Sequence, residues 1–444
     1  MNKQTFIKDL LAGLTVSFAA LSLGAAFGTL SGRGAFAGMI GAAIIPIITS
    51  LFGGTRLQAS GPTAPMTAVS ALLVAGAYES FPDKVHAEQF ITFTMLLFGL
   101  LMIISGLLRF GKLIQYVPNA VTLGFMNGIA LLIWVDQVSK IFGIHHMHQI
   151  EGSLWINIAV ATITLVLIFL LPTIIKAIGI HEKYHSYISA MLLAIIASTV
   201  ASNMLDLKIE RVALGASVDS FSQYWGMIKS YFPNQTMLTR ENFNLALPFA
   251  LQLTLLGYLD SLLTSLVIDR MTNEKTKRNK ELVAQGVANG LSGLFLGIPG
   301  AQATIRSVLL IKEQAQTRLA GVILGLFVLI CIIFLKDYIM LIPAAVFTGV
   351  LLKAGWDVLD REYTQAYFER GWIRSINRNF QMFLILYTTV VTVLFDLNIA
   401  VVTATLLFYI ARYVFKSQNL TDVEDNLADN IEDDWFPEAG ELKQ

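Results

Sequence analysis

Long apolar stretches follow one another along almost the whole chain, separated by short polar segments or by Gly/Pro breaks. An α-helix needs about 20 predominantly apolar residues to cross the hydrocarbon core of a bilayer. About fourteen stretches have this length or are slightly shorter. The pattern therefore predicts an all-α polytopic membrane protein with the lipid bilayer as its surroundings. The expected spans are approximately 10–30, 34–52, 63–78, 89–108, 118–135, 153–172, 187–204, 245–268, 282–296, 303–311, 319–335, 338–356, 380–395 and 399–415.

The composition favours the same class. Hydrophobic residues make up 55% of the 444 residues and charged residues only 14%, whereas a soluble domain carries roughly 25% charged residues. The formal net charge is zero, so nothing indicates a nucleic-acid partner. The first span lacks a strongly basic leading segment and a clear cleavage site, so we expect a retained helix and not a signal peptide. Cys331 is the single cysteine, which excludes an intrachain disulfide.

The distribution of basic residues predicts the orientation. They gather after the even-numbered spans, and the positive-inside rule makes those loops cytoplasmic. Both termini then lie on the cytoplasmic side of a plasma or bacterial inner membrane, whereas residues 206–243 lie outside. The basic residues concerned are Arg109, Lys112, Arg270, Lys275, Lys277, Arg278, Lys280, Arg361, Arg370, Arg374 and Arg378.

Two of the expected spans are too short to cross a bilayer unaided. Thr63–Tyr78 follows the segment Ala59–Pro62, and Ala303–Ile311 follows Gly297–Gly300. Each is the third span of its half when the chain is divided before about residue 245, and halves of seven spans must be inverted relative to each other. We therefore expect a first repeat over 1–244 with an external loop at 206–243, a second repeat over 245–416, and a tail over 417–444.

Short, Gly/Pro-interrupted segments at matching positions of two halves point to a binding site near the bilayer midplane. The N-terminus of each half-helix offers unpaired N–H groups and the positive end of a helix dipole, so an anion fits between them. The alternative is that Pro62, Pro65 and Pro299 merely kink ordinary helices.

Asp260 lies deep in the apolar stretch Phe249–Ile268. A carboxylate at membrane depth is costly and is by default a functional residue. It is interpreted as a cation ligand or as a proton acceptor, because burial raises a carboxylic pKa. Thr264 follows at i+4 and shares its helix face. The alternative is an Asp260 that only bonds to neighbouring helices.

Several long, ordered motifs resemble the sulfate permease (SulP) family of anion transporters, over residues 8 to about 415. They are Phe52-Gly53-Gly54-Thr55, Ser60-Gly61-Pro62-Thr63-Ala64-Pro65-Met66-Thr67, Asp260-Ser261-Leu262-Leu263-Thr264-Ser265, Asn279-Lys280-Glu281-Leu282-Val283-Ala284-Gln285-Gly286 and Ile298-Pro299-Gly300-Ala301-Gln302-Ala303-Thr304. The resemblance implies a 7+7 inverted repeat with a core and a gate domain, elevator-type movement of the core, and anion substrates.

Within the family, the motifs look most similar to sodium-dependent bicarbonate transporters. That resemblance implies that Asp260 and Thr264 bind sodium as coupling ion, helped by backbone carbonyls near Gly300. It places the anion between Thr63 and Ala303-Thr304. No other cofactor is implied.

Two residues beside this expected site, Gln302 and Arg306, each have more than one possible role. The family commonly has Gly where Gln302 stands, so its amide either contacts the anion or points away. Arg306 suits an oxyanion through bidentate hydrogen bonds. It can instead pair with a gate-domain carbonyl or extend to the cytoplasmic surface.

Other polar residues favour simpler roles. Gln285 and Asn289 share a helix face and are expected to form interhelical hydrogen bonds. His145, His146 and His148 indicate a solvated loop more than a metal site, and Asp136 and Asp396 are expected to cap spans. The sequence contains no Walker, GxSxG or HExxH motif, so we expect no enzyme.

The tail, residues 417–444, carries nine acidic side chains and Lys443 as its only basic one. Such a segment cannot bury a core and is expected to be largely disordered; Trp435-Phe436 is a hypothetical docking element for the basic loops. Family members usually continue into a STAS domain at this point. Regulation and dimerisation attributed to that domain do not carry over, and a homodimer is left open.

The sequence thus predicts a secondary active transporter of bicarbonate or sulfate, coupled to sodium. The alternatives are a C4-dicarboxylate carrier, a chloride or anion exchanger, and a proton-coupled symporter on the same fold. A nucleobase permease, a channel and a membrane enzyme fit the residues less well.

Overall fold

The computed structural model describes residues 3–81, 83–144, 150–177, 190–211, 221–334, 340–369, 375–395 and 397–415. The expected histidine loop, Asp396 and the acidic tail lie outside these residues. The described helices are α1 (Lys3–Leu30), α2 (Ala35–Phe52), α3 (Ala64–Ser80), α4 (Lys84–Leu107), η1 (Phe110–Tyr116), α5 (Asn119–Phe142), α6 (Leu154–Ala177), α8 (Ala190–Met204), α9 (Phe221–Tyr231), α10 (Arg240–Thr272), α11 (Arg278–Leu294), α12 (Thr304–Lys312), α13 (Leu319–Phe334), α15 (Ala344–Val358), α16 (Glu362–Glu369), α17 (Ile376–Leu394) and α18 (Leu397–Val414).

The expected all-α membrane fold is confirmed. Among the described helices, α1, α2, α4, α5, α6 and α10 are long and apolar enough to cross a bilayer. Shorter apolar helices of 10–17 residues accompany them in α8, α13, α15 and α18. The number of about fourteen spans stays a prediction.

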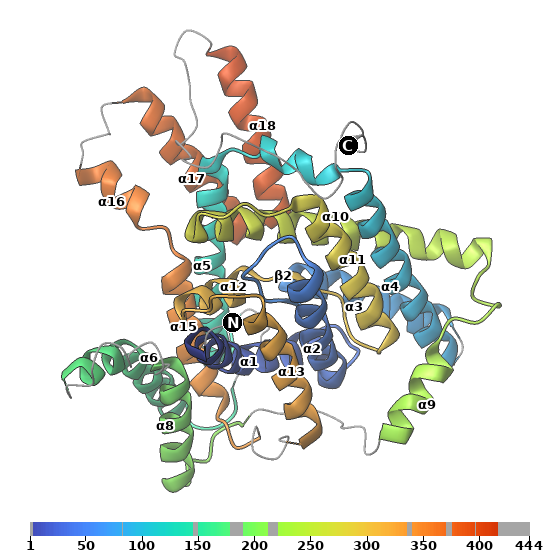
Figure 1. Cartoon of the computed structure of the whole chain (residues 1–444), viewed down its shortest axis with the longest axis horizontal. Coiled ribbons are helices and arrows are strands. Elements are labelled where there is room, and N and C mark those ends of the chain that lie inside the picture. Colours follow the sequence, from blue (N-terminus) through green and yellow to red (C-terminus); the bar gives the residue numbers. More distant parts are fainter. Residues whose placement is uncertain are drawn as a thin grey trace.

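The helices pack in two groups. A core group contains α1 to α4 and α10 to α13, and a gate group contains α5, α6, α8, α15, α17 and α18. In Figure 1 most of the gate group lies to the left and most of the core group to the right. This division agrees with the core and gate domains that the resemblance implies.

One sequence interpretation of a helix end is wrong. Asp136 was expected to cap the fifth span, but α5 continues to Phe142, so Asp136 lies inside the helix. The apolar stretch ends early because Gln137, Ser139 and Lys140 follow it. These polar residues are compatible with helix, and α5 ends only at Gly143, which adopts the left-handed conformation typical of a helix C-terminus.

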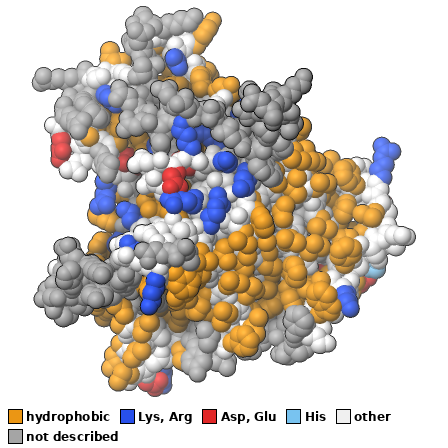
Figure 2. All heavy atoms as spheres, in the orientation of Figure 1, with side chains coloured by type: hydrophobic (Ala, Val, Ile, Leu, Met, Phe, Trp, Pro, Cys, Tyr) orange, Lys and Arg blue, Asp and Glu red, His pale blue; other side chains and the backbone are white. Residues whose placement is uncertain are grey.

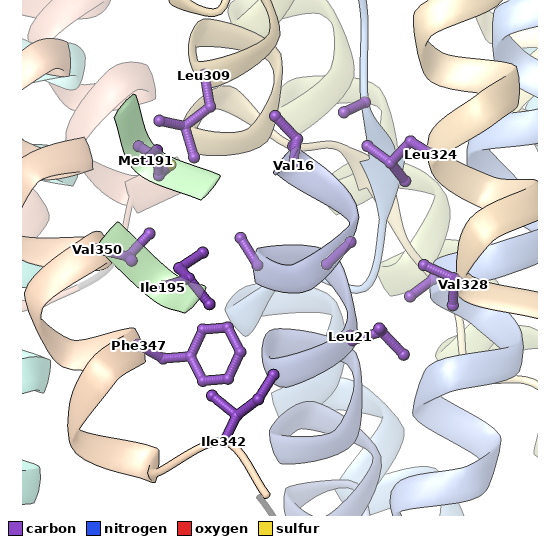
Figure 3. Packing of buried hydrophobic residues seen from close by; sticks show 14 of the residues in the cluster. Val16, Leu21, Met191, Ile195, Leu309, Leu324, Val328, Ile342, Phe347 and Val350 are labelled. Carbon is purple, nitrogen blue, oxygen red and sulfur yellow. The ribbon is translucent and has the colours of Figure 1, made fainter. Parts of the chain in front are cut away.

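A hydrophobic cluster joins the two groups. Figure 3 shows Val16 and Leu21 of α1 between Leu324 of α13 on one side and Phe347 of α15 on the other. All four side chains are almost fully buried. Because α1 contacts α13 in the core and α15 in the gate, the boundary between the groups is apolar at this point.

Strands β1 (Ser60–Gly61) and β2 (Ala301–Gln302) form a short antiparallel pair in which Ser60 faces Gln302 and Gly61 faces Ala301. Irregular backbone at membrane depth needs internal hydrogen-bond partners. The pairing satisfies part of that need and holds the two Gly/Pro breaks of the chain against each other. The half-helices α3 and α12 therefore begin at the two opposite ends of this short pair.

Candidate ion-binding site

Because β1 and β2 are antiparallel, α3 and α12 begin at opposite ends of the strand pair. Thr63 is the N-cap of α3 and Ala303 is the N-cap of α12, and neither provides a side-chain cap hydrogen bond. The first N–H groups of a helix lack intrahelical partners. Without a side-chain cap, these donors and the two dipole ends favour a negative charge between the half-helices.

Helix α10 contacts both half-helices through one face. Asp260 Oδ2 accepts a hydrogen bond from Thr63 Oγ1 at 2.9 Å, and Thr264 Oγ1 lies 2.6 Å from Thr304 Oγ1. Both α10 side chains are buried, with exposures of 6% and 1%. The i, i+4 pair therefore reaches the N-cap of α3 with its carboxylate and the first residue of α12 with its hydroxyl. The structure brings these four predicted residues together.

Arg306 lies in the first turn of α12 and is buried, with 1% exposure. Its Nη2 donates to the Pro62 carbonyl at 3.0 Å, whereas Nε and Nη1 have no hydrogen-bond partner. It forms no ion pair with any acid in the described part of the chain. The alternatives of a gate-domain carbonyl and of extension to the surface are both wrong, since Pro62 belongs to the core group. A buried cation without an acidic partner favours binding an anion.

Gly61 makes room for this guanidinium. A Cβ at Gly61 would lie 2.8 Å from Arg306 Nη1, and its φ of +145° is a conformation that other residues rarely adopt. The glycine of β1 therefore allows the arginine of α12 to approach the backbone before α3.

The side chain of Gln302 lies against the loop between α2 and β1. Its Oε1 accepts from Thr55 Oγ1 at 3.4 Å, while its buried Nε2 has no partner. Thr55 is linked to Thr276 at 3.0 Å, and Thr276 donates to Asp269 at 2.6 Å. The backbone N–H of Gln302 donates to Ser261 Oγ at 3.2 Å. Direct contact of Gln302 with an anion stays a prediction.

Gly300 is held by the side-chain amide of Asn289. The Gly300 N–H donates to Asn289 Oδ1 at 2.7 Å, and its carbonyl accepts from Asn289 Nδ2 at 2.9 Å. A carbonyl oxygen has a second lone pair, so this bond does not exclude the expected role in cation binding, which stays a prediction. Asn289 Nδ2 also donates to the Gln285 carbonyl at 2.8 Å, so these bonds lie within α11 or reach the break that follows it, and do not run between helices as expected.

Sequence reasoning missed Glu281. This residue is completely buried in the first turn of α11 and accepts hydrogen bonds from Thr55 N, Gln58 Nε2 and Gln285 Nε2 at 2.9–3.0 Å. Gln285 also donates to Ser60 Oγ of β1 at 2.8 Å. The missed signal was spacing, because Glu281, Gln285 and Asn289 follow at i, i+4, i+8 on one helix face. Gln285 bonds to β1 and Asn289 bonds to Gly300 just before β2, so this face of α11 fixes the position of the strand pair.

We expect Asn289→Ala to lower the melting temperature of the purified protein. The substitution leaves the buried N–H and carbonyl of Gly300 without their partner, and each unsatisfied group costs about 1–3 kcal/mol. The control is Val287→Ala on the same helix, since Val287 is 38% exposed. Equal melting temperatures for both variants would contradict the supporting role of Asn289.

The chain is similar to known proteins over most of its length. The model of the sulfate permease family matches residues 6–368. The chain belongs to the sulfate permease family. A putative sulfate transporter of Bacillus subtilis, YvdB, is 30% identical over 92% of this chain and 74% of its own length. The bicarbonate transporter BicA of a Picosynechococcus strain is 30% identical over 97% of this chain and 76% of its own length.

Solved structures support the fold. The transmembrane domain of a cyanobacterial BicA superposes with a TM-score of 0.61 at 28% identity, over 90% of this chain and 98% of that domain. The murine anion transporter Slc26a9, in its inward-facing state, gives a TM-score of 0.63 at 18% identity and covers 94% of this chain and 69% of its own. The second likeness concerns the fold alone.

Proposed function

We propose that the protein is a secondary active transporter of small inorganic oxyanions, bicarbonate or sulfate, coupled to sodium. The observation that carries the proposal is the combination of two half-helix N-termini without side-chain caps and the buried Arg306 without an acidic partner. These donors suit the oxygen atoms of a small anion. The names of the family and of the relatives favour the same two substrates.

Asp260 and Thr264 are the proposed sodium ligands. Sodium is a hard cation that prefers oxygen ligands, and the Asp260 carboxylate lies with the hydroxyls of Thr63, Thr264 and Thr304 on the same side of the half-helices. A bound cation offsets both the negative charge of Asp260 and that of the substrate. This electrostatic balance is the physical reason for cotransport.

The proposed movement is an elevator-type displacement of the core group against the gate group, with both termini on the cytoplasmic side of the plasma or inner membrane. The site residues Thr63, Asp260 and Arg306 all belong to the core group. Its boundary with the gate is hydrophobic at α1 and α15. Hydrophobic contact is non-directional and imposes no hydrogen-bond register, so such a boundary supports sliding.

Uptake into proteoliposomes tests the proposal. Labelled sulfate, bicarbonate and fumarate are supplied with an inward sodium gradient, with an inward proton gradient, or with neither. Sodium-driven accumulation of sulfate or bicarbonate is the expected result. Accumulation of fumarate alone, proton-driven uptake, or gradient-independent exchange against internal chloride would each replace the proposal with the corresponding alternative.

We expect Asp260→Asn to make uptake independent of sodium. Asparagine preserves the size of the side chain and can still accept from Thr63, but it removes the charge that attracts the cation. The control is Asp136→Asn, because Asp136 is an aspartate of α5, which belongs to the gate group. Uptake that retains its sodium dependence in Asp260→Asn would exclude this carboxylate as the coupling group.

A further inference from the structure

Basic side chains gather at one end of the core group. We define the basic cluster as Arg56, Lys112, Lys277, Lys280 and Arg318. Figure 2 shows Lys and Arg side chains gathered near the middle of one face of the molecule, with fewer acidic side chains among them.

Backbone contacts bring the cluster together. Arg318 Nη1 donates to the carbonyls of Gly53 and Thr55 at 2.8 and 3.2 Å, and the Lys277 N–H donates to the Gly54 carbonyl at 3.5 Å. Arg318 and Lys277 therefore contact the same loop. Arg56 follows that loop directly, and Lys280 lies one turn after Lys277 on α11.

Few acidic side chains offset the positive charge of the basic cluster. Glu274 pairs with Arg56, its Oε2 lying 2.7 Å from Arg56 Nε. Glu281 is buried and accepts only from neutral groups. No acid among the described residues forms an ion pair with Lys277 or Lys280. A surface with several uncompensated cations attracts a polyanion more strongly than any single exposed pair does.

The last described helix, α18, contacts η1, the segment that carries Lys112. In α18, close to its end at Val414, Tyr409 Oη donates to the Tyr116 carbonyl of η1 at 3.1 Å. In η1, the Gly111 N–H donates to Asn279 Oδ1 of α11 at 3.0 Å. Five residues before its end, α18 therefore contacts the segment that carries Lys112, and this segment in turn contacts the start of α11.

We propose that residues 417–444 dock on the basic cluster and so link the gate group to the core group. The segment carries nine acidic residues against one lysine, which complements the charge of the cluster. At ~3.3 Å per residue the segment reaches up to about 90 Å, far more than the docking requires. Docking would join the two groups, because residues 417–444 follow α18 of the gate group in the sequence, whereas the cluster lies mainly on core elements.

Spin-label mobility in the full-length protein tests the docking without any transport measurement. A nitroxide is attached at Ala439→Cys, since the native Cys331 is fully buried, and the protein is placed in zwitterionic nanodiscs. We expect an immobilised fraction that falls at least threefold with Lys277→Glu plus Lys280→Glu or in 0.5 M salt, because salt screens exposed charges. Lys208→Glu, an exposed lysine outside the cluster, is the matched control and should change nothing.

Charge exchange keeps the test decisive if the double variant folds poorly. Adding Glu432→Lys, Asp433→Lys and Asp434→Lys to the double variant should restore the immobilised fraction. Equal label mobility with and without the two cluster substitutions would overturn the proposal. In a second set of nanodiscs that contain anionic lipid, loss of bound anionic lipid from the double variant, with unchanged label mobility, would overturn it as well by assigning the cluster to a lipid surface.

Discussion

Gly300→Ala is expected to abolish anion transport and to destabilise the purified protein strongly. A Cβ at Gly300 would lie 2.2 Å from the backbone C and O atoms of Gly61 and 2.7 Å from Pro62 N. These atoms belong to the break before α3 and cannot rotate away as a side chain can. Overpacking typically lowers the free energy of unfolding by about 1–3 kcal/mol. We expect a clash with backbone atoms at the strand pair to cost at least the upper value of this range. The clash also pushes apart the two half-helix N-termini that form the site.

The matched control is Gly290→Ala on α11. Nothing lies within 4 Å of a Cβ at Gly290, and alanine favours helix over glycine by about 1 kcal/mol. Thermal melting and uptake are measured for both variants, and Gly290→Ala should remain active and at least as stable as the natural protein. If Gly300→Ala melts and transports like Gly290→Ala, the close approach of the two breaks is not required.

Arg306→Ala is expected to weaken anion binding by about 10- to 100-fold. Hydrogen bonds to charged groups contribute about 1.5–3 kcal/mol, and each 1.4 kcal/mol changes an affinity about tenfold. The effect appears as loss of the anion-dependent rise in melting temperature, because a ligand stabilises the state that binds it. Part of the damage is structural, since the Pro62 carbonyl loses its donor.

Arg306→Lys separates the two contributions. Lysine keeps the charge but not the planar fork, so it should retain weak anion binding while losing selectivity for planar or tetrahedral oxyanions over chloride. Anion affinity that is unchanged in both Arg306 variants would remove this residue from the site. An equal loss of melting temperature with and without anion would assign it a purely structural role.

Several features of this site are readable from the sequence. Apolar stretches of the length of a bilayer predict the membrane fold, and the breaks around Pro62 and Pro299 predict two half-helices. The isolated charge of Asp260 in an apolar stretch predicts a site residue. The first two inferences agree with the structure, because membrane depth makes each exception to apolarity costly. The role of Asp260 stays a prediction.

Other features needed the three-dimensional arrangement. Glu281 stands near the end of a span among Lys280 and Arg278, where an exposed acid is the ordinary expectation, but loop residues Thr55 and Gln58 fold over it and bury it. The place of the Arg306 side chain depends on the space that Gly61 leaves for it. The pairing of β1 with β2 fixes the position of Gly61. Long-range pairings of this kind leave no periodic signal in a sequence.

The central claim is that sodium at Asp260 and an oxyanion between the half-helices bind together. Thermodynamic linkage tests it directly, because coupled ligands raise each other's affinity by the same factor. Sulfate and bicarbonate are titrated calorimetrically into the protein in sodium gluconate and in choline gluconate. The account predicts that sodium raises the affinity for one of these anions at least about tenfold, or about 1.4 kcal/mol, and that Asp260→Asn removes the difference. Equal anion affinity in sodium and choline for the natural protein would contradict it.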